Sequence, residues 1–201
     1  MAFVNVLFPN PKLIHGLQRS SNQPTTIVTN GAAEFRLNKL SNYRITWKWP
    51  SRLIKAEDRK AIATFFSDTA QGGLYSFKFL DPDLNAWTGQ SLVYTGSGNN
   101  FYLKSPIDNH PIFHLDAGVQ VRSGATPVSY TIKVLNGVPV VNVPGHTSGL
   151  TITGTFYFAA RFNQPDISWA MAALNSSNQS VGDELSDLSL IEVFEHNHPT
   201  A

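Results

Sequence analysis

Hydrophobic and polar positions alternate with a period of two over much of the chain, and this pattern predicts β-strands. The longest alternating segments are residues 25–29 and 35–49, with the turn-forming pair Asn30 and Gly31 between them. In the second segment, Tyr43, Ile45, Trp47 and Trp49 point to one face, and Arg44, Thr46 and Lys48 point to the other. We therefore expect a hairpin followed by a half-buried strand that ends at Pro50.

Residues 55–70 change to the helical period, and this is the one segment for which we predict an α-helix. The residues that mark one face of it are Asp58, Ile62, Phe65, Phe66 and Thr69. Acidic residues lie in the expected first turn, and Gly72 and Gly73 follow the expected end, as is typical of helix boundaries.

The strand predicted after this helix is rich in aromatic residues, since Tyr75, Phe77 and Phe79 alternate with small or polar positions. It ends at an acid-proline-acid turn. Asp81 and Asp83 in that turn could act as an acid–base pair, but acids beside proline more often accept backbone hydrogen bonds, and we favour that role.

Residues 84–155 contain short apolar runs separated by Gly, Pro and Asn, which predicts a small barrel or sandwich. Long alternation returns at 156–162, where one face carries Phe156, Phe158, Ala160 and Phe162 and the other carries Tyr157 and Arg161. Further strands are predicted near 167–171 and at 188–195. The expected organisation is a mainly-β fold with one main α-helix, in which residues 1–84 and 154–201 form one domain and residues 85–153 an inserted one.

Composition excludes several kinds of function. Charged residues make up 14% of the chain and the net charge is +1, so we expect no basic groove that follows nucleic-acid phosphates. The absence of cysteine excludes disulfides, thiolate zinc sites and a cysteine nucleophile. The opening residues MAFVNVLFPNPK lack a cationic leader and a long apolar run, so we expect a cytoplasmic protein with neither a secretory signal nor a membrane span.

The segment DNHPIFHLD offers possible metal ligands in His110 and His114, with Asp108 and Asp116 beside them. Pro111 disfavours a helix through both histidines, and a strand would separate them by roughly 13 Å, too far for one ion. We expect exposed loop histidines and turn acids, and no metal or cofactor.

The remaining motifs give equally weak evidence for a catalytic or ligand-binding site. No G-x-S-x-G elbow is present, and the HTSG at 146–149 is expected to be a polar turn. GSGNN at 96–100 is expected to be a hairpin turn rather than a phosphate loop, and Asp183 and Glu184 are a weak carboxylate pair. We therefore predict no enzyme, with a β-sandwich hydrolase as a minor alternative. The main alternative is a carbohydrate-binding β-sandwich for host-surface attachment, with Trp47 and Trp49 as its platform.

Three segments are similar, in order, to motifs of one protein family. The first comprises Phe8, Pro9, Ile14, Gly16, Thr26, Val28, Gly31, Glu34 and Arg36. The second comprises Ala61, Phe65, Phe66, Gly73, Tyr75, Phe77, Phe79 and Asp81. The third comprises Gly154, Phe156, Arg161, Phe162, Asn163, Asp166, Ile191, Glu192 and Val193. On these residues the chain resembles the distal tail proteins of long-tailed, siphovirus-type bacteriophages and gene transfer agents, although Asn163 stands where an acid is usual.

The resemblance implies a ring-forming β-sandwich or split-barrel domain made by both ends of the chain, carrying an inserted small OB-like barrel. It implies a homohexameric ring at the virion tail tip that joins the tail tube protein to the tip hub protein and fibres, assembled in the host cytoplasm without membrane insertion. DNA would pass through the lumen only as cargo. The residues expected to fill the core or to be shared between subunits are Trp47, Trp49, Phe65, Phe66, Gly73, Tyr75, Phe77, Phe79, Asp81, Arg161, Phe162 and Glu192.

Overall fold

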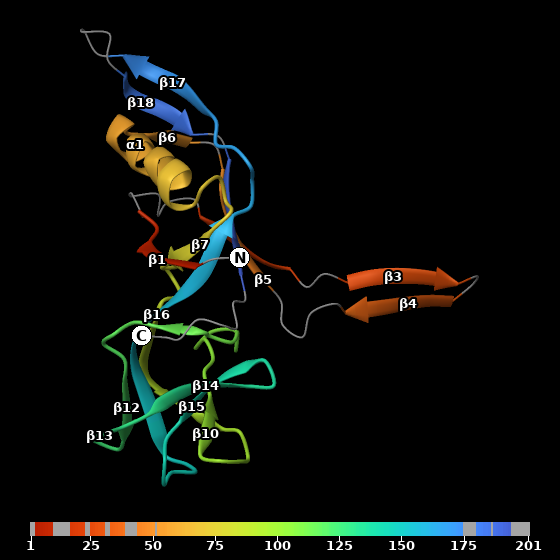
Figure 1. Ribbon diagram of the computed structural model, residues 1–201, viewed down its shortest axis with the longest axis vertical. Helices are drawn as coiled ribbons and strands as arrows, with labels where there is room; N and C mark the ends of the chain where they lie inside the picture. Colours follow the sequence, from red (N-terminus) through yellow and green to blue (C-terminus); the bar gives the residue numbers. More distant parts are fainter. Residues whose placement is uncertain are drawn as a thin grey trace. The chain divides into compact units, whose positions relative to one another are not determined.

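The structure is a computed structural model, and it describes residues 3–9, 17–22, 25–30, 33–38, 44–50, 52–174, 180–185 and 187–193 (Figure 1). The chain divides into two compact units. The first comprises the described residues within Met1–Lys78 and Ala160–Val193, and the second comprises Phe79–Ala159. Both ends of the described chain therefore contribute to the first unit.

The strands that build the main sheet of the first unit follow the order β1 (Phe3–Leu7), β7 (Ser76–Phe79), β16 (Leu150–Phe162), β19 (Leu188–Glu192), β5 (Arg44–Trp49) and β2 (Gln18–Asn22). β16 contributes its last residues, since Ala160 to Phe162 pair with Glu192 to Leu190. A second sheet has the order β17 (Trp169–Leu174), β18 (Ser180–Leu185) and β6 (Arg52–Ile54). A third consists of β3 (Thr25–Asn30) and β4 (Ala33–Asn38).

The predicted hairpin is confirmed, because β3 and β4 pair antiparallel from Thr25 opposite Asn38 to Asn30 opposite Ala33. Gly31 and Tyr43 lie outside the described residues. The predicted strand face before Pro50 is confirmed for the described part of the segment: Ile45, Trp47 and Trp49 are all buried on β5.

The predicted helix is also confirmed, as α1 (Ala56–Thr64), with Glu57 and Asp58 in its first turn. It differs from the expectation at its end, where residues Phe65–Thr69 form a π-helix, η1. The wider turn is closed by the Ala70 amide, which donates to the carbonyl of Phe65 at 2.8 Å. A π-turn is rare and is found frequently at functional sites.

Alternation predicts β7 and β16 less completely. Phe77 and Phe79 are buried as expected. Ser76, which alternation places on the opposite face, is buried as well. In β16 the apolar face is buried throughout, and Tyr157 and Ala159 on the other face are buried too. The central part of β16 is thus packed on both faces, which explains why a simple polar-out assignment fails there.

In the second unit, β16 pairs with the strands β8 (Ala86–Ser91), β11 (His114–Leu115) and β12 (Gln120–Ser123), and β12 also pairs with β13 (Thr126–Val128). Four further strands form a sheet in the order β14 (Thr131–Leu135), β15 (Val138–Asn142), β10 (Asn100–Tyr102) and β9 (Val93–Tyr94). The mainly-β fold is therefore confirmed, with one α-helix among the residues that the structure describes. Within the described residues no barrel closes, because β14 and β9 remain at opposite edges, so the small barrel expected for 85–153 is replaced by open sheets.

The core of the second unit is centred on β16 and Trp87. The ring of Trp87 lies 4.3 Å from that of Phe156, and its Nε1–H donates to the carbonyl of Lys104 at 2.8 Å. Gly154 lies where the β16–β8 register shifts, with φ at 140°, and a Cβ there would come within 2.6 Å of the Cα of Val119. Only glycine allows that approach. None of the helices in the described ranges has the length and apolarity needed to cross a bilayer.

Candidate functional site

An aromatic cluster in the first unit joins three distant parts of the sequence. Phe8, which follows β1, stacks on Phe77 at 5.7 Å between ring centroids and meets Phe65 edge-on at 5.5 Å. Phe65 in turn meets Phe77 edge-on at 4.8 Å, and Phe162 at the end of β16 lies 5.3 Å from Phe77. All four rings are buried, so these predicted residues form a core rather than an exposed surface.

Trp47 and Trp49 extend this core. Their side chains are 0% and 1% exposed, and the ring of Trp49 lies 6.3 Å from that of Phe8. A sugar platform must present the face of an aromatic ring to solvent. The structure therefore contradicts the carbohydrate-platform role for these two tryptophans and assigns them to packing.

Gly73 and Phe66 lie where η1 leads into β7. Gly73 is buried with φ at 86°, and a Cβ on it would approach the carbonyl oxygen of Phe162 at 3.2 Å. The half-buried Phe66 ring meets Phe162 edge-on at 4.8 Å. Tyr75, just before β7, is half-buried as well.

Glu192 is a buried carboxylate at the end of β19. Its Oε2 accepts the backbone N–H of Ile45 at 3.0 Å, one position beyond the last β19–β5 pair, Ile191 opposite Thr46. The side chain thus satisfies an amide at the position where the ladder ends. Arg161, on β16, is half-buried.

Phe79 and Asp81 belong to the second unit, and both are buried. The Oδ1 of Asp81 accepts the backbone N–H groups of Asp83 at 3.0 Å and of Leu84 at 3.2 Å. This is the backbone-accepting turn expected from the sequence. Asp83 and Glu184 are exposed, and the side chain of Asp183 is outside the part of the chain whose side chains are described.

The expectation of exposed loop histidines is wrong. His110 is 0% exposed and His114 is 4% exposed. His114 stacks on Tyr157 at 5.2 Å between ring centroids, and His110 lies 6.0 Å from the ring of Phe158. Because β11 pairs with the aromatic part of β16, the segment that carries His110 and His114 packs in the core and does not lie on the surface.

The acids beside these histidines do behave as turn acids. Asp108 accepts the backbone N–H of His110 at 3.2 Å, and Asp116 accepts that of Ala117 at 2.9 Å. Over the ranges that the structure describes, no group of three or more His, Cys, Asp or Glu residues is placed to hold a metal ion.

Both predicted turns are also confirmed. Residues 96–99 connect β9 and β10, which pair antiparallel with Tyr94 opposite Phe101, and the amide of Thr95 donates to the carbonyl of Asn100 at 2.9 Å. Residues 146–149 lie between β15 and β16. Neither segment precedes a helix that could present amides to a phosphate.

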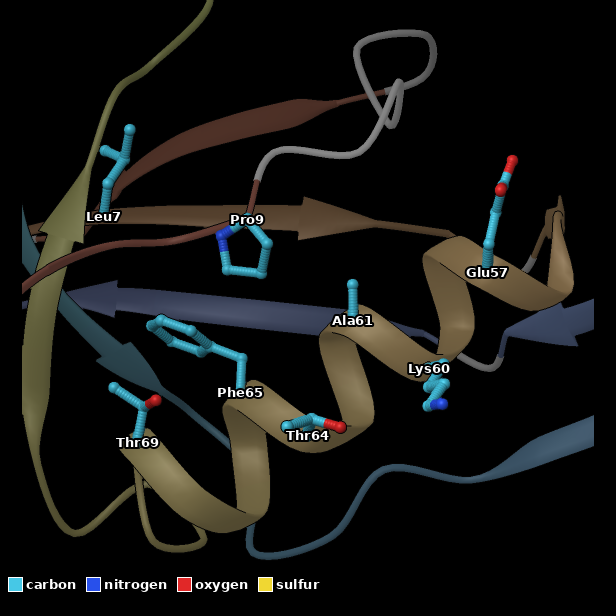
Figure 2. Close-up of a pocket in the computed structure, with 8 residues that line it drawn as sticks. All are labelled: Leu7, Pro9, Glu57, Lys60, Ala61, Thr64, Phe65 and Thr69. Carbon is cyan, nitrogen blue, oxygen red and sulfur yellow. The ribbon is translucent and has the colours of Figure 1, made fainter.

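The candidate functional site is an open groove of about 480 Å³ beside the helix, which we call the helix groove (Figure 2). Leu7 and Pro9 form one side of it. The other side is formed by residues of α1 and η1: Glu57, Lys60, Ala61, Thr64, Phe65 and Thr69. The π-turn therefore supplies part of the wall.

The helix groove has an apolar lining with charges at one end. Leu7 is 46% exposed and Ala61 is also exposed, while Phe65 joins the groove to the aromatic core. Figure 2 shows Pro9 above the Phe65 ring, and Glu57 and Lys60 farther along the helix. An open apolar groove of this kind suits a protein segment better than a reaction, since no nucleophile–base pair lines it.

The sequence pattern does not predict this groove as a unit. It places Phe65 and Thr69 on one face of the helix and does not indicate Ala61 as a lining residue. One signal was present in the sequence: Val6, Leu7 and Phe8 are consecutive apolar residues, which breaks the alternation of a half-buried strand.

No family model matches the chain. No curated protein matches it either. Among solved structures, a chain of the "Virion of native gene transfer agent (GTA) particle" is similar with 16% identity and a TM-score of 0.47, over 96% of this chain and 99% of that chain. An identity and a TM-score this low do not establish a shared function.

Proposed function

We propose that the chain is a structural virion protein of the distal tail type. In this role, six copies of the first unit form a ring that joins the tail tube to the tip hub and fibres, and DNA passes through the lumen as cargo. The second unit, an insertion in the chain, is carried by the ring. The proposal includes neither catalysis nor a cofactor.

One observation carries the proposal: the motif residues behind the family resemblance meet in one place. Phe8, Phe65, Phe77 and Phe162 come from all three motif segments, and their rings are in mutual contact. Residues that matched the three motifs only by chance would not be expected to pack into one core. Their convergence supports a shared ancestral fold for the first unit.

The surface of the first unit is consistent with self-assembly. Val6, Leu7 and Leu74 are large apolar residues that are all more than two-fifths exposed. A head-to-tail interface that closes into a ring requires two different, complementary patches, and such interfaces are enriched in apolar residues. The net charge of +1 also suits a passage through which a polyanion moves without being held.

The test is the state of association of the full chain. We expect sedimentation velocity at several protein concentrations to show a concentration-dependent species larger than the monomer, and negative-stain images to show rings. Six subunits per ring can be counted by mass photometry. A chain that stays monomeric at tens of micromolar and shows no rings in the images would contradict the proposal.

A further inference from the structure

The four-stranded sheet of the second unit carries positive charge and no negative charge. Its strands β14, β15 and β10 lie side by side (Figure 1), and β9 follows β10. None of the four strands contains Asp or Glu, and neither do the turns at residues 95–99 and 136–137 that connect them in pairs. The acids of residues 79–159 are Asp81, Asp83, Asp108 and Asp116, and all four lie outside this sheet. A lysine on the sheet is therefore not neutralised by an acid of the same sheet.

Strand pairing places two lysines and a tyrosine on one face of this sheet. Tyr102 is opposite Val140 in one pair of strands, and Val140 is opposite Lys133 in the next, so their side chains form a row across the face. Lys104 follows Tyr102 by two residues, and its Nζ lies 4.7 Å from the centroid of the Tyr102 ring. This lysine and the ring are therefore on the same face.

This face is open to solvent, and we call it the Tyr102 face. Its members are Val93, Tyr102, Lys104, Lys133 and Leu135. Val93, opposite Tyr102, is 61% exposed, and Leu135, two residues after Lys133, is 38% exposed. Lys133 is exposed, while Tyr102 and Lys104 are half-buried. The Tyr102 face thus offers apolar surface beside two ammonium groups.

Both ammonium groups are available to an anion. Within the part of the chain that the structure describes, neither Lys104 nor Lys133 forms an ion pair. An ammonium over an aromatic ring is positioned by the cation–π attraction and keeps N–H donors for a second partner. Sheet spacing puts the Cα atoms of Lys104 and Lys133 about 12 Å apart, two strands across and two residues along. That separation suits two anionic groups of one long molecule better than a single small ion.

We propose that the Tyr102 face binds an acidic polysaccharide. The apolar faces of its sugar rings pack on Val93 and Tyr102, and its carboxylates pair with Lys104 and Lys133. The inference goes beyond the proposed function and does not require a ring, because every residue of the face belongs to one unit of one chain.

Two other kinds of partner fit this face less well. A nucleic acid carries a phosphate at every nucleotide and is held by many cations along a groove, whereas the Tyr102 face presents two. An extended acidic peptide would add to the open edge of a strand, whereas these side chains project from the face of the sheet. An acidic polysaccharide combines widely spaced carboxylates with apolar ring faces, and both have a counterpart here.

The test is the binding of a fluorescently labelled uronic-acid oligomer to the full chain, measured by fluorescence anisotropy. We expect a saturable rise in anisotropy, with an affinity that falls as salt increases because exposed charges are screened. An unlabelled uronic-acid oligomer should compete, and a neutral glucose oligomer of the same length should not. Absence of binding at hundreds of micromolar protein would overturn the proposal. Equal competition by the neutral oligomer, or by single-stranded DNA of equal charge, would overturn it as well.

Variants of the Tyr102 face separate the contributions of charge and ring. Lys104→Gln and Lys133→Gln each remove one ammonium, and we expect each to weaken binding about two- to fivefold. Tyr102→Leu retains an apolar side chain without the ring, and we expect it to weaken binding about threefold or more. Tyr102→Phe keeps the ring and should bind as the wild type does.

Arg122→Gln is the matched control for charge. Arg122 lies on β12, in a different sheet of the same unit, and its Nη2 donates to the Oε1 of Gln120 at 2.9 Å. The substitution removes one positive charge, as the lysine variants do, but it should leave binding unchanged. Circular dichroism should be the same for all variants. If Arg122→Gln and Lys133→Gln weaken binding equally, only net charge matters and the Tyr102 face is not the site.

This inference and the proposed function fail separately. A chain that forms rings but does not bind the uronic-acid oligomer loses only the polysaccharide site. A chain that binds the oligomer but forms no rings loses only the ring function.

Discussion

At the scale of single residues, Gly73 illustrates how the main chain can approach a neighbouring strand. Its φ of 86° lies in the region that favours glycine, and the carbonyl oxygen and Cβ of Phe162 lie 3.2 and 3.3 Å from where its own Cβ would be. We expect Gly73→Ala to lower the free energy of unfolding of the first unit by about 1–3 kcal/mol, measured by urea denaturation.

The control for this substitution is the preceding residue. Gly72 also has a positive φ, at 67°, but its Cβ would make only ordinary contacts at 4.0 Å. Gly72→Ala should therefore cost clearly less than Gly73→Ala. Equal losses would mean that backbone strain alone, and not the contact with Phe162, explains the effect.

Glu192 stabilises the sheet by accepting the backbone N–H of Ile45. Replacing it by Ala leaves the Ile45 N–H buried without this acceptor, which we expect to cost about 1–3 kcal/mol in urea denaturation. Glu192→Gln retains a side-chain oxygen at the same length and should recover much of the loss. An alanine variant as stable as the glutamine variant would show that the amide finds another acceptor.

Ionisation of Tyr157 is expected to make the free energy of unfolding of the second unit depend on pH in the alkaline range. Burial raises the pKa of its hydroxyl above the usual 10.0, and the Asp116 carboxylate raises it further. Because the folded-state pKa is higher than the unfolded one, the stabilisation is complete below about pH 10 and is lost as pH rises through the raised value. We expect the free energy of unfolding to fall above about pH 10.

Tyr157→Phe should make this alkaline loss shallower in urea denaturation measured across that range, while keeping a ring beside His114. Some dependence should remain, because burial also raises the pKa of Tyr130, whose hydroxyl donates to the carbonyl of Val119 at 3.0 Å. An unchanged pH profile in the Phe variant would exclude Tyr157 as a contributor.

At the scale of elements, the aromatic cluster connects the end of β1 with η1, β7 and β16. Phe8 contacts rings of all these elements and is 1% exposed. We expect Phe8→Ala to lower the free energy of unfolding of the first unit by about 3–5 kcal/mol, measured by intrinsic tryptophan fluorescence in urea. Phe66→Ala, at a half-buried position, should cost less; an equally small loss at Phe8 would argue against one connected core.

Elements with one buried face could be predicted from the sequence, and elements defined by long-range pairing could not. β5 and β19 alternate because one face packs on the core, and α1 is marked by the acids of its first turn and by the buried Ile62. β2, with the sequence QRSSN, carries no apolar pattern at all and exists because its backbone pairs with β5. The π-turn at Phe65–Thr69 likewise depends on a backbone hydrogen bond that no residue pattern encodes.

The same distinction applies to the candidate site. The sequence predicted which aromatic residues would be important, since Phe65, Phe77 and Phe162 are all in the cluster. It could not predict the helix groove, which forms only when Leu7 on β1 faces Ala61 on α1 across 54 positions of sequence. It also failed for His110 and His114, because their burial depends on pairing with a distant strand.

At the scale of the whole molecule, two separate cores predict two unfolding events. The first unit has the Phe8, Phe65, Phe77 and Phe162 cluster, and the second has Trp87 packed on Phe156. We expect scanning calorimetry of the full chain to show two transitions, since a domain with its own core can unfold on its own.

Core variants identify which transition belongs to which unit. Phe77→Ala should lower the first unit's transition temperature by several degrees and leave the other nearly unchanged, while Phe156→Ala should do the reverse, because each ring packs against its own cluster. Val93→Ala, at an exposed position, should change neither. A single transition that both core variants lower equally would mean that the two units unfold as one cooperative body.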